Sequence, residues 1–202
     1  IYSDASGPAF DVAAHSTVGA YDDLDAVARF AASVDVVTYE FENVPHDTAA
    51  AALRAAPVRP GVKALEVAQD RLIEKQFIAG LGVPVAPFAA VDCDASLKAA
   101  TDALGLPAIL KTRRLGYDGK GQVRLSDRND IARARAALGN APAILEGFVG
   151  FQLEVSVLVV RGVDGTERSS AVPLNTHQNG ILDTPVVPAP IPAMAAARAR
   201  EI

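Results

Sequence analysis

Cysteine and long apolar runs are scarce in this sequence of 202 residues. The single cysteine, Cys93, cannot form a disulfide within the chain, so the composition favours a reducing, cytoplasmic environment. No apolar run approaches the roughly 20 residues of a membrane-spanning helix, so we expect no membrane partner. The formal net charge of −5 argues against nucleic acid as a partner.

The residues that are present suit a folded α/β protein. Half of them are hydrophobic and 21% are charged, which is enough apolar surface for one or two compact domains. Helical spacing predicts a helix over Asp22–Ala32, and the β-branched and aromatic residues of Val34–Phe41 predict a strand. Asp47 or Thr48 is expected to cap a helix that runs to about Ala56. This alternation predicts part of a parallel α/β sheet.

The sequence changes character after Gly61. One helical segment is predicted over Gly61–Ala79, and the strands beyond it come in neighbouring pairs instead of alternating singly with helices. These predicted strands are Val83–Val91, Ala108–Arg113, Gln122–Leu125, Ala143–Val149, Leu153–Arg161 and Ser169–Leu174. Helices are expected over Ala95–Leu104 and from about Asp127 to Leu138. We therefore predict a domain boundary near Gly61–Asp70.

The strongest chemical signal is K-T-R-R-L-G-Y-D-G-K-G-Q at Lys111–Gln122. Its three glycines allow the backbone to turn tightly and to bring N–H groups close to an anion. Its four lysines and arginines would neutralise a polyphosphate. Neither G-x-x-x-x-G-K-[ST] nor a clean G-x-G-x-x-G is present. From these residues alone, an ordinary β-hairpin with surface cations is as good an interpretation as a phosphate site.

Several segments resemble the ATP-grasp enzymes. Q-D-R-L-I-E-K at Gln69–Lys75 and L-G-V-P-V-A-P at Leu81–Pro87 resemble the opening of their middle domain. P-A-I-L-K-T-R-R-L-G-Y-D-G-K-G-Q at Pro107–Gln122 is similar to the 5-(carboxyamino)imidazole ribonucleotide synthase family of the purine pathway. Three further segments resemble the same family and occur in the same order along the chain. They are T-Y-E-F-E-N-V-P at Thr38–Pro45, I-L-E-G-F-V at Ile144–Val149 and the segment Asn179–Pro190.

The resemblance implies an α/β ATP-grasp fold in three parts. These are a partial parallel α/β (pre-ATP-grasp) domain at 1–62 that lacks its first strand and helix, a small α+β ATP-grasp subdomain at 63–150, and the truncated start of the C-terminal ATP-grasp sheet at 151–202. The chain opens without methionine and closes in a helix-forming segment. We therefore interpret it as an internal fragment, inactive alone, of a cytoplasmic enzyme that the resemblance implies is a homodimer.

The resemblance also implies an ATP site. Arg71 and Lys111 would contact the phosphates, and the loop Gly116–Gln122 would close over the triphosphate. Backbone groups of Glu146–Val149 would bind the adenine edge, and Glu154 would accept hydrogen bonds from the ribose hydroxyls. The loop and hinge residues so implied are Gly116, Tyr117, Asp118, Gly119, Lys120, Gly121, Gln122, Glu146, Gly147, Phe148 and Val149. From strand alternation alone, Glu154 would instead be a solvated strand residue.

Two acidic residues, Glu40 and Glu42, share one face of their predicted strand, whose end suits a ligand crevice. The resemblance implies that they face aminoimidazole ribonucleotide and that Tyr117 and Asp118 reach the same substrate from the loop. A charged strand edge that aids solubility is the alternative. His177 resembles the family's nucleotide-side histidine, although P-L-N-T-H is shorter here than the family segment.

The implied reaction is the ATP-dependent carboxylation of 5-aminoimidazole ribonucleotide with bicarbonate, through carboxyphosphate. Its cofactors are ATP and Mg²⁺, because phosphoryl transfer depends on positioning and on charge neutralisation. The magnesium ligands are expected beyond Ile202, so the sequence assigns no metal ligand within this chain. The alternatives are another ATP-grasp carboxylase or ligase and a non-catalytic ATP-binding module.

Overall fold

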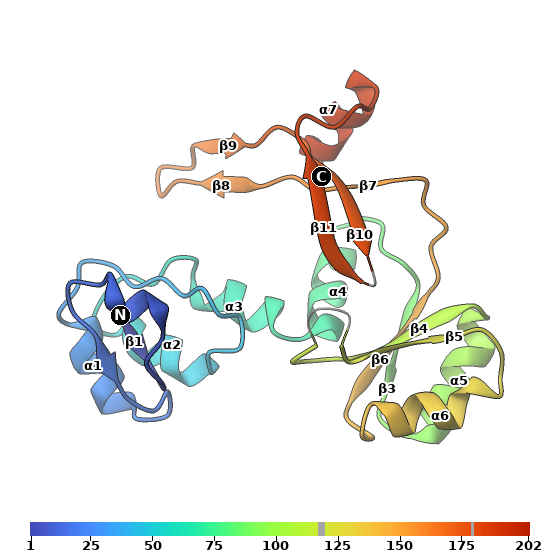
Figure 1. Cartoon of the computed structure of the whole chain (residues 1–202), viewed down its shortest axis with the longest axis horizontal. Coiled ribbons are helices and arrows are strands. Elements are labelled where there is room, and N and C mark those ends of the chain that lie inside the picture. Colours follow the sequence, from blue (N-terminus) through green and yellow to red (C-terminus); the bar gives the residue numbers. More distant parts are fainter. Residues whose placement is uncertain (117–119, 179) are drawn as a thin grey trace. The chain divides into compact units, whose positions relative to one another are not determined.

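The protein divides into two compact units. Its computed structural model describes residues 1–116, 120–178 and 180–202. Unit 1 comprises Ile1–Phe77 together with Arg113–Leu115, and unit 2 comprises Ile78–Thr112 and Gly116–Ile202. Figure 1 labels most of the helices and strands along the chain.

Unit 1 combines short parallel strands with helices. Its elements are β1 (Tyr2–Ser3), η1 (Pro8–Asp11, a 3-10 helix), β2 (Thr17–Val18), α1 (Leu24–Ala31), α2 (His46–Leu53), α3 (Val62–Ala68) and the first part of α4 (Arg71–Gly80). Strands β1 and β2 pair in parallel, as expected for an α/β domain. Helix α1 confirms the predicted helix, and Asp23 caps it by accepting a hydrogen bond from the Ala26 N–H at 2.9 Å. The buried core of the unit consists of Val27, Ala31, Ala51, Ala52, Ala56 and Val58.

The predicted strand Val34–Phe41 is wrong. The structure has a single parallel bridge there, between Val37 and Val58. The Val37 N–H donates to the Pro57 carbonyl at 2.8 Å, and the Val37 carbonyl accepts from the Arg59 N–H at 2.8 Å. A strand needs a partner for its backbone groups all along its length, and the described residues of 34–41 have a strand-like partner only at Val37.

The predicted cap of α2 is also wrong. The helix begins at His46, directly after Pro45, and no side chain caps it. The Thr48 hydroxyl donates instead to the Tyr21 carbonyl at 2.5 Å, and Asp47 lies within the first turn, paired with His46. The Thr48 side chain, which the local pattern predicted as a helix cap, is therefore engaged in a tertiary hydrogen bond instead.

The predicted helix Gly61–Ala79 is two helices, α3 and α4 (Arg71–Gly80). The break lies at Asp70, whose Oδ1 accepts from the N–H groups of Leu72 at 2.9 Å and Ile73 at 3.4 Å. A carboxylate in this position satisfies the first N–H groups of a new helix. Hydrophobic periodicity continues through such a break and cannot reveal it.

A four-stranded antiparallel sheet organises the first part of unit 2. Its strands, in spatial order, are β3 (Phe88–Val91), β6 (Ala143–Gly147), β4 (Ala108–Thr112) and β5 (Gln122–Leu125). Helices α5 (Asp94–Leu104) and α6 (Asp130–Ala137) pack against it (Figure 1). Their shared core consists of Val91, Leu97, Ala100, Ala108, Leu110, Leu125, Ala134, Leu138, Ala143 and Leu145.

These elements confirm the predicted strands and helices of this region, although several are shorter than predicted. Strand β6 ends at Gly147 instead of Val149, and helix α6 is Asp130–Ala137 instead of about Asp127 to Leu138. Strand β3 begins at Phe88 instead of Val83. Pro84 and Pro87 precede it, and a proline has no N–H to donate to a neighbouring strand.

Beyond residue 150, unit 2 forms two smaller antiparallel sheets and a helix. β7 (Glu154–Val155), β10 (Leu174–Gln178) and β11 (Ile181–Val186) lie in the order β11–β10–β7, β8 (Val159–Arg161) pairs with β9 (Glu167–Ser169), and α7 (Ala193–Glu201) follows. The single strand predicted at Leu153–Arg161 is therefore wrong, because its two halves pair with different partners. The ends of the strand predicted at Ser169–Leu174 likewise belong to β9 and β10.

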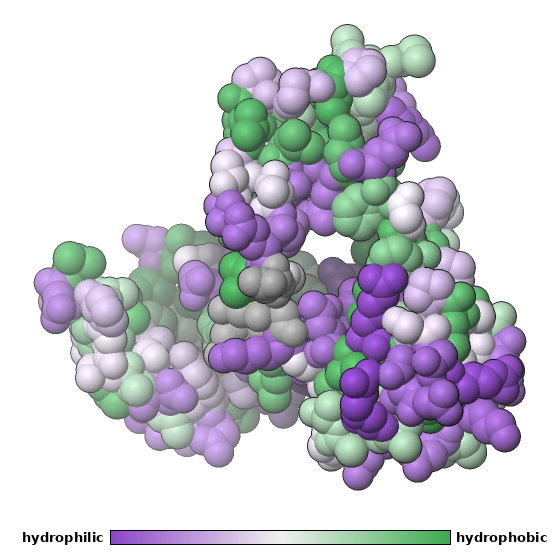
Figure 2. Space-filling model, turned by 45° about the vertical axis from the view of Figure 1, so that its right-hand side comes forward, coloured by the Kyte–Doolittle hydropathy of each residue, from purple (hydrophilic) through white to green (hydrophobic). Residues whose placement is uncertain are grey.

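Apolar side chains of this C-terminal region remain accessible. Leu158, Val160 and Val163 are exposed by 73%, 69% and 91%. Figure 2 shows hydrophobic side chains interspersed with hydrophilic ones over much of the visible surface. In the part of the chain that the structure describes, no helix combines the length and the apolar character that crossing a membrane requires.

Candidate nucleotide site

Lys111 and Glu146 form a partly buried ion pair on the four-stranded sheet. Lys111 lies on β4, and Glu146 on β6 is paired with Ile109, two residues earlier along β4. The two side chains are therefore diagonal neighbours on one face of the sheet. The Lys111 Nζ atom lies 2.9 Å from Oε2 of Glu146, and the side chains are exposed by 25% and 9%. The pair presents a positioned ammonium group that is open enough to contact an anion.

The predicted adenine hinge, Glu146–Val149, comprises the last two residues of β6 and the two residues after it. The Gly147 N–H donates to the Pro87 carbonyl at 2.8 Å, and the Phe148 N–H donates to the Pro107 carbonyl at 3.2 Å. Among the described residues, the Val149 N–H has no backbone acceptor. Of these three N–H groups, that of Val149 is therefore the one left to donate to a base.

Phe148 brings an aromatic ring to the same hinge. The guanidinium carbon of Arg124, on β5, lies 4.5 Å from the centre of the Phe148 ring. This cation–π contact holds the ring on the sheet while its side chain remains 44% exposed. Sequence reasoning missed Arg124, because its position depends on the register that places it opposite Ile109.

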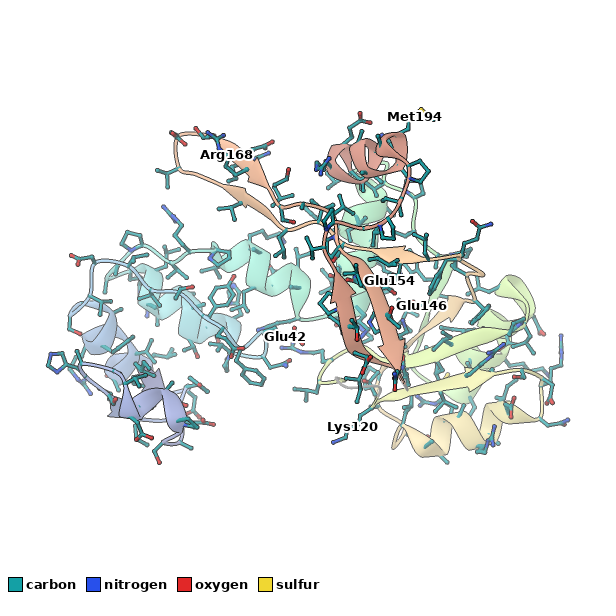
Figure 3. The ribbon with its side chains drawn as sticks, turned by 45° about the horizontal axis from the view of Figure 1, so that its top comes forward. Glu42, Lys120, Glu146, Glu154, Arg168 and Met194 are labelled. Atoms are coloured by element: carbon teal, nitrogen blue, oxygen red, sulfur yellow. The ribbon has the colours of Figure 1, made fainter. Side chains whose placement is uncertain are left out.

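Glu154, Asn175 and His177 meet on β7 and β10 (Figure 3 labels Glu154). The register pairs Glu154 with Asn175, whose Nδ2 donates to Oε1 of Glu154 at 3.4 Å. The His177 Nδ1 atom lies 3.5 Å from the same oxygen, and the side chains of His177 and Glu154 are exposed by 37% and 42%. A half-exposed carboxylate held in this way can accept hydrogen bonds from sugar hydroxyls. Asn175 was missed from the sequence, although it stands two positions from His177 in a strand pattern.

The glycine loop is held at its base by a close backbone approach. The Thr112 N–H donates to the Gly121 carbonyl at 2.8 Å, and Gly121 has a φ of +70°. A Cβ atom at Gly121 would lie 2.7 Å from the Thr112 Oγ1 and 3.3 Å from the Gly116 Cα. Gln122 begins β5 opposite Lys111, and Lys120 is exposed. The predicted site residues Tyr117, Asp118 and Gly119 lie outside the described residues.

Arg71 begins α4 in unit 1. Its N–H donates to the Arg113 carbonyl at 3.0 Å, and the Arg113 guanidinium forms a bidentate pair with Asp70. Burial raises the pKa of Asp70, but the hydrogen bonds from Arg113 and from the N–H groups of Leu72 and Ile73 outweigh it and place the pKa below its usual range. Sequence reasoning missed Asp70 as a structural partner, although it lies inside the Q-D-R motif.

Glu40 and Glu42 do not lie on a strand, so the prediction that they share a strand face is wrong. Both are exposed, in a bend and a turn respectively. Glu40 borders a largely apolar hollow of about 650 Å³ in unit 1, which is also lined by Tyr39 and Phe41. Their proposed contact with a substrate therefore rests on the resemblance and not on strand geometry.

Family models match nearly the whole chain. Residues 76–202 match the ATP-grasp domain, and residues 1–69 match the ribonucleotide synthetase preATP-grasp domain. The chain belongs to the ATP-grasp family. The predicted fold class, an α/β ATP-grasp fold preceded by a pre-ATP-grasp domain, is confirmed.

Several relatives of this ATP-grasp chain share one name. The N5-carboxyaminoimidazole ribonucleotide synthase of Brucella melitensis is 50% identical over 198 residues, which are 97% of this chain and 55% of the relative. The enzyme of the same name from Pseudomonas aeruginosa is 46% identical over 177 residues, 88% of this chain and 49% of the relative. A solved N5-carboxyaminoimidazole ribonucleotide synthetase in complex with ADP has a TM-score of 0.93 at 38% identity and covers 99% of this chain and 53% of its own. The chain thus spans about half the length of the relatives that it matches.

The described residues contain no ready-made cluster of magnesium ligands. Among them, no group of three or more His, Cys, Asp or Glu side chains could hold a metal ion. Mg²⁺ prefers an octahedral set of oxygen ligands, and the carboxylates of Glu146 and Glu154 are engaged with Lys111 and Asn175. We therefore assign no metal ligand in the described parts of the chain.

Proposed function

We propose that this chain carries the ATP-binding part of a ligase that carboxylates 5-aminoimidazole ribonucleotide with bicarbonate. The products would be N5-carboxyaminoimidazole ribonucleotide, ADP and phosphate. The observation that carries the proposal is the Lys111–Glu146 pair, which fixes a cation on the strand that leads into the glycine loop. The shared name of the relatives and the ADP complex of a similar structure support it.

In this proposal each group of residues binds one part of ATP. Lys111, Arg71 and the loop residues Gly116–Gln122 bind the phosphates, where positive charge and backbone N–H groups favour an anion. The Val149 N–H donates to the adenine edge, next to the ring of Phe148. Glu154, supported by Asn175 and His177, accepts from the ribose hydroxyls.

Glu146 serves the phosphate site indirectly. It compensates the charge of Lys111 in the absence of a nucleotide and keeps the ammonium group on one face of the sheet. Because the pair is largely shielded, its orientation costs little further entropy when the phosphates arrive.

The proposed reaction has three steps. An oxygen of bicarbonate attacks the γ-phosphorus of ATP, so that the bond between that phosphorus and the β,γ-bridging oxygen breaks and ADP leaves. The resulting carboxyphosphate breaks its bond between the carbon and the bridging oxygen, which gives CO₂ and phosphate. The amine of aminoimidazole ribonucleotide then forms a bond to the carbon of CO₂ and loses a proton. The chain's contribution is to hold ATP, and Mg²⁺ would neutralise charge on the transferring phosphoryl group.

The remaining parts of the proposal rest on the resemblance. Glu40, Glu42, Tyr117 and Asp118 would contact aminoimidazole ribonucleotide. The domain bounds 1–62, 63–150 and 151–202, a homodimer and a cytoplasmic location belong to the same proposal.

The test is ADP release by the natural protein that contains this sequence. We expect release that requires both bicarbonate and aminoimidazole ribonucleotide, and ADP release that needs neither substrate would refute the named activity. Release with a different carboxylate or amine would favour another ATP-grasp ligase. ATP binding without turnover under any condition would favour a non-catalytic ATP-binding module. The 202-residue chain alone is expected to release no ADP, because it spans about half the length of its relatives.

A further inference from the structure

Asp70 holds the segment that follows β4. The Nε atom of Arg113 lies 3.0 Å from Oδ1 and 2.9 Å from Oδ2 of Asp70, and Nη2 lies 2.7 Å from Oδ2. The Asp70 side chain is exposed by 10% and that of Arg113 by 24%. A bidentate pair between charged groups, largely shielded from water, fixes both the place and the orientation of the guanidinium.

Gln69 uses both ends of its amide. Its Oε1 accepts from Nη2 of Arg114 at 2.9 Å, and its Nε2 donates to the Val44 carbonyl. The donor and acceptor ends of an amide differ, so the two contacts select one orientation of this buried side chain. Gln69 therefore joins the segment that carries Glu40 and Glu42 to the arginines after β4.

The backbone strengthens this arrangement. The Arg113 carbonyl accepts from the Arg71 N–H, while Asp70 caps the helix that Arg71 begins. Leu115, two residues after Arg113, has a φ of +64°. This left-handed conformation is costly for a residue with a Cβ atom and persists where the surrounding contacts hold it.

We propose that Gln69 and Asp70 are positioning residues for the ligase reaction proposed above, on which this inference rests. By holding Arg113 and Arg114, they fix the path along which the chain leaves Lys111 and enters the glycine loop. Through Gln69, the same contacts couple this path to the segment of Glu40 and Glu42. A purely structural role would need only the helix cap of Asp70 and would not require the two arginine contacts.

The first test uses Asp70→Asn in the natural protein that contains this sequence. Asparagine is as good a helix cap as aspartate, but it cannot accept a charged bidentate pair. We expect kcat/KM for ATP to fall on the order of 10- to 100-fold, as typical of a lost charge-assisted contact that positions reactants. The control is Asp130→Asn, because Asp130 also accepts from backbone N–H groups at a helix start and pairs with Arg133.

The Asp130→Asn control shows whether a loss of kcat/KM comes from lost positioning or from lost stability. We expect Asp130→Asn to leave kcat/KM for ATP within about twofold of the natural value and to lower Tm by no more than Asp70→Asn does, because Arg133 is the more exposed partner. Equal kcat/KM in the two variants would overturn the proposal. If Asp70→Asn does not fold, Arg113→Lys carries the same expectation, because lysine keeps the charge but cannot form the bidentate pair.

A double variant tests whether the two side chains act through each other. We expect Asp70→Asn combined with Arg113→Gln to have a kcat/KM for ATP within about twofold of the worse single variant. Losses in kcat/KM that multiply would contradict the shared role.

A variant of Gln69 tests the contact with Val44. Gln69→Leu is expected to raise KM for aminoimidazole ribonucleotide as well as for ATP. A rise in KM for ATP alone would contradict the proposed coupling through Val44.

Trypsin cleavage gives a readout that needs no turnover. In the natural protein, cleavage after Arg113 and Arg114 should be slow because Asp70 and Gln69 engage both side chains. We expect Asp70→Asn to accelerate it several-fold and Asp130→Asn to leave it unchanged, and equal rates in both variants would overturn the proposal. If the natural protein lacks the proposed ligase activity, the proposed function fails, whereas this cleavage still decides whether the two residues hold the segment.

Discussion

The four-stranded sheet and the region beyond residue 150 lie in one compact unit but differ in how they bury apolar side chains. In the sheet and its helices, Val91, Leu97, Leu110, Leu125 and Leu145 are fully buried. Among the described residues beyond 150, Val172 is the one buried hydrophobic side chain. The first region has two layers that cover each other, whereas the second consists of separate thin sheets.

Because of this difference, the residues of the candidate site are held in place in different ways in the two regions. A closed core holds Lys111 and Glu146 at fixed positions, because the strands that carry them cannot shift without exposing apolar surface. Glu154 and His177 stand on two- and five-residue strands, β7 and β10, that gain little from burial. The proposed phosphate side of the site is therefore held by a closed core, and the proposed ribose side depends on polar contacts between strands.

The largest effect that we expect is the loss of a core side chain. Leu145→Ala, at a fully buried position of β6, should lower the free energy of unfolding by about 4 kcal/mol, within the usual range of 2–5 kcal/mol. Leu182→Ala, at a position of β11 that is 49% exposed, should cost about 1 kcal/mol or less. Urea titrations of both variants measure this difference, and equal losses would show that the two regions do not differ as described.

A second comparison uses one ion pair from each region. Lys111→Met removes the Lys111 ammonium group from the largely buried Glu146 carboxylate and should cost about 3 kcal/mol, the lower end of the usual range because Lys111 is a quarter exposed. Arg161→Met breaks the pair with Glu167 in the β8–β9 hairpin, where both side chains are exposed, and should cost less than about 1 kcal/mol. The measurements are the free energies of unfolding, together with the Kd for ATP, which should rise only for Lys111→Met. A Kd that rises equally for both variants would contradict the role of Lys111.

A third pair of variants isolates the close approach in the glycine loop. Gly121→Ala combines a left-handed φ with a contact of 2.7 Å to the Thr112 Oγ1 and should destabilise by about 2 kcal/mol. Gly139→Ala has a φ of +60° but open space around the new methyl group, and should cost about 1 kcal/mol. If thermal unfolding shows the same loss of stability for both variants, the left-handed backbone conformation alone explains the loss at Gly121, and the close approach of Thr112 adds nothing.

The smallest effect concerns acid. The pKa of Asp70 in the folded protein lies below its value in the unfolded chain, so its ionised form stabilises the fold above the unfolded pKa of about 4. This contribution is lost as the pH falls through the folded pKa. The free-energy difference between the natural protein and Asp70→Asn should therefore shrink as the pH is lowered from 6 towards about 3. A difference that stays constant over this range would show that the Asp70 charge does not contribute.

The sequence predicted the elements whose pattern and partners are both local. Strands β4 and β5 and helix α5 were found because alternation, the glycine turn and Gly105 mark them directly. Val34–Phe41 and Leu153–Arg161 have the same strand propensity, but their pairing depends on distant backbone groups, which a local pattern does not contain. The start of α4 depends on the hydrogen bonds that the Asp70 carboxylate accepts from the N–H groups of Leu72 and Ile73.

The candidate site was predicted through the resemblance, residue by residue. Its geometry could not be predicted in the same way. The pairing of Lys111 with Glu146 and of Glu154 with Asn175 follows from strand register, and the contacts of Gln69 and Asp70 follow from tertiary packing. Sequence motifs name the groups that are proposed to bind, whereas the contacts that hold those groups become visible only in the fold.

The most direct measurement of the central claim follows an oxygen atom from bicarbonate. The natural protein that contains this sequence would be incubated with ATP, aminoimidazole ribonucleotide and ¹⁸O-labelled bicarbonate, and the released phosphate would be analysed by mass. If carboxyphosphate forms on the ATP bound by Lys111 and the glycine loop, one labelled oxygen appears in each phosphate formed with ADP. ADP release that yields unlabelled phosphate would mean that water attacks ATP, and it would contradict the proposed carboxylation.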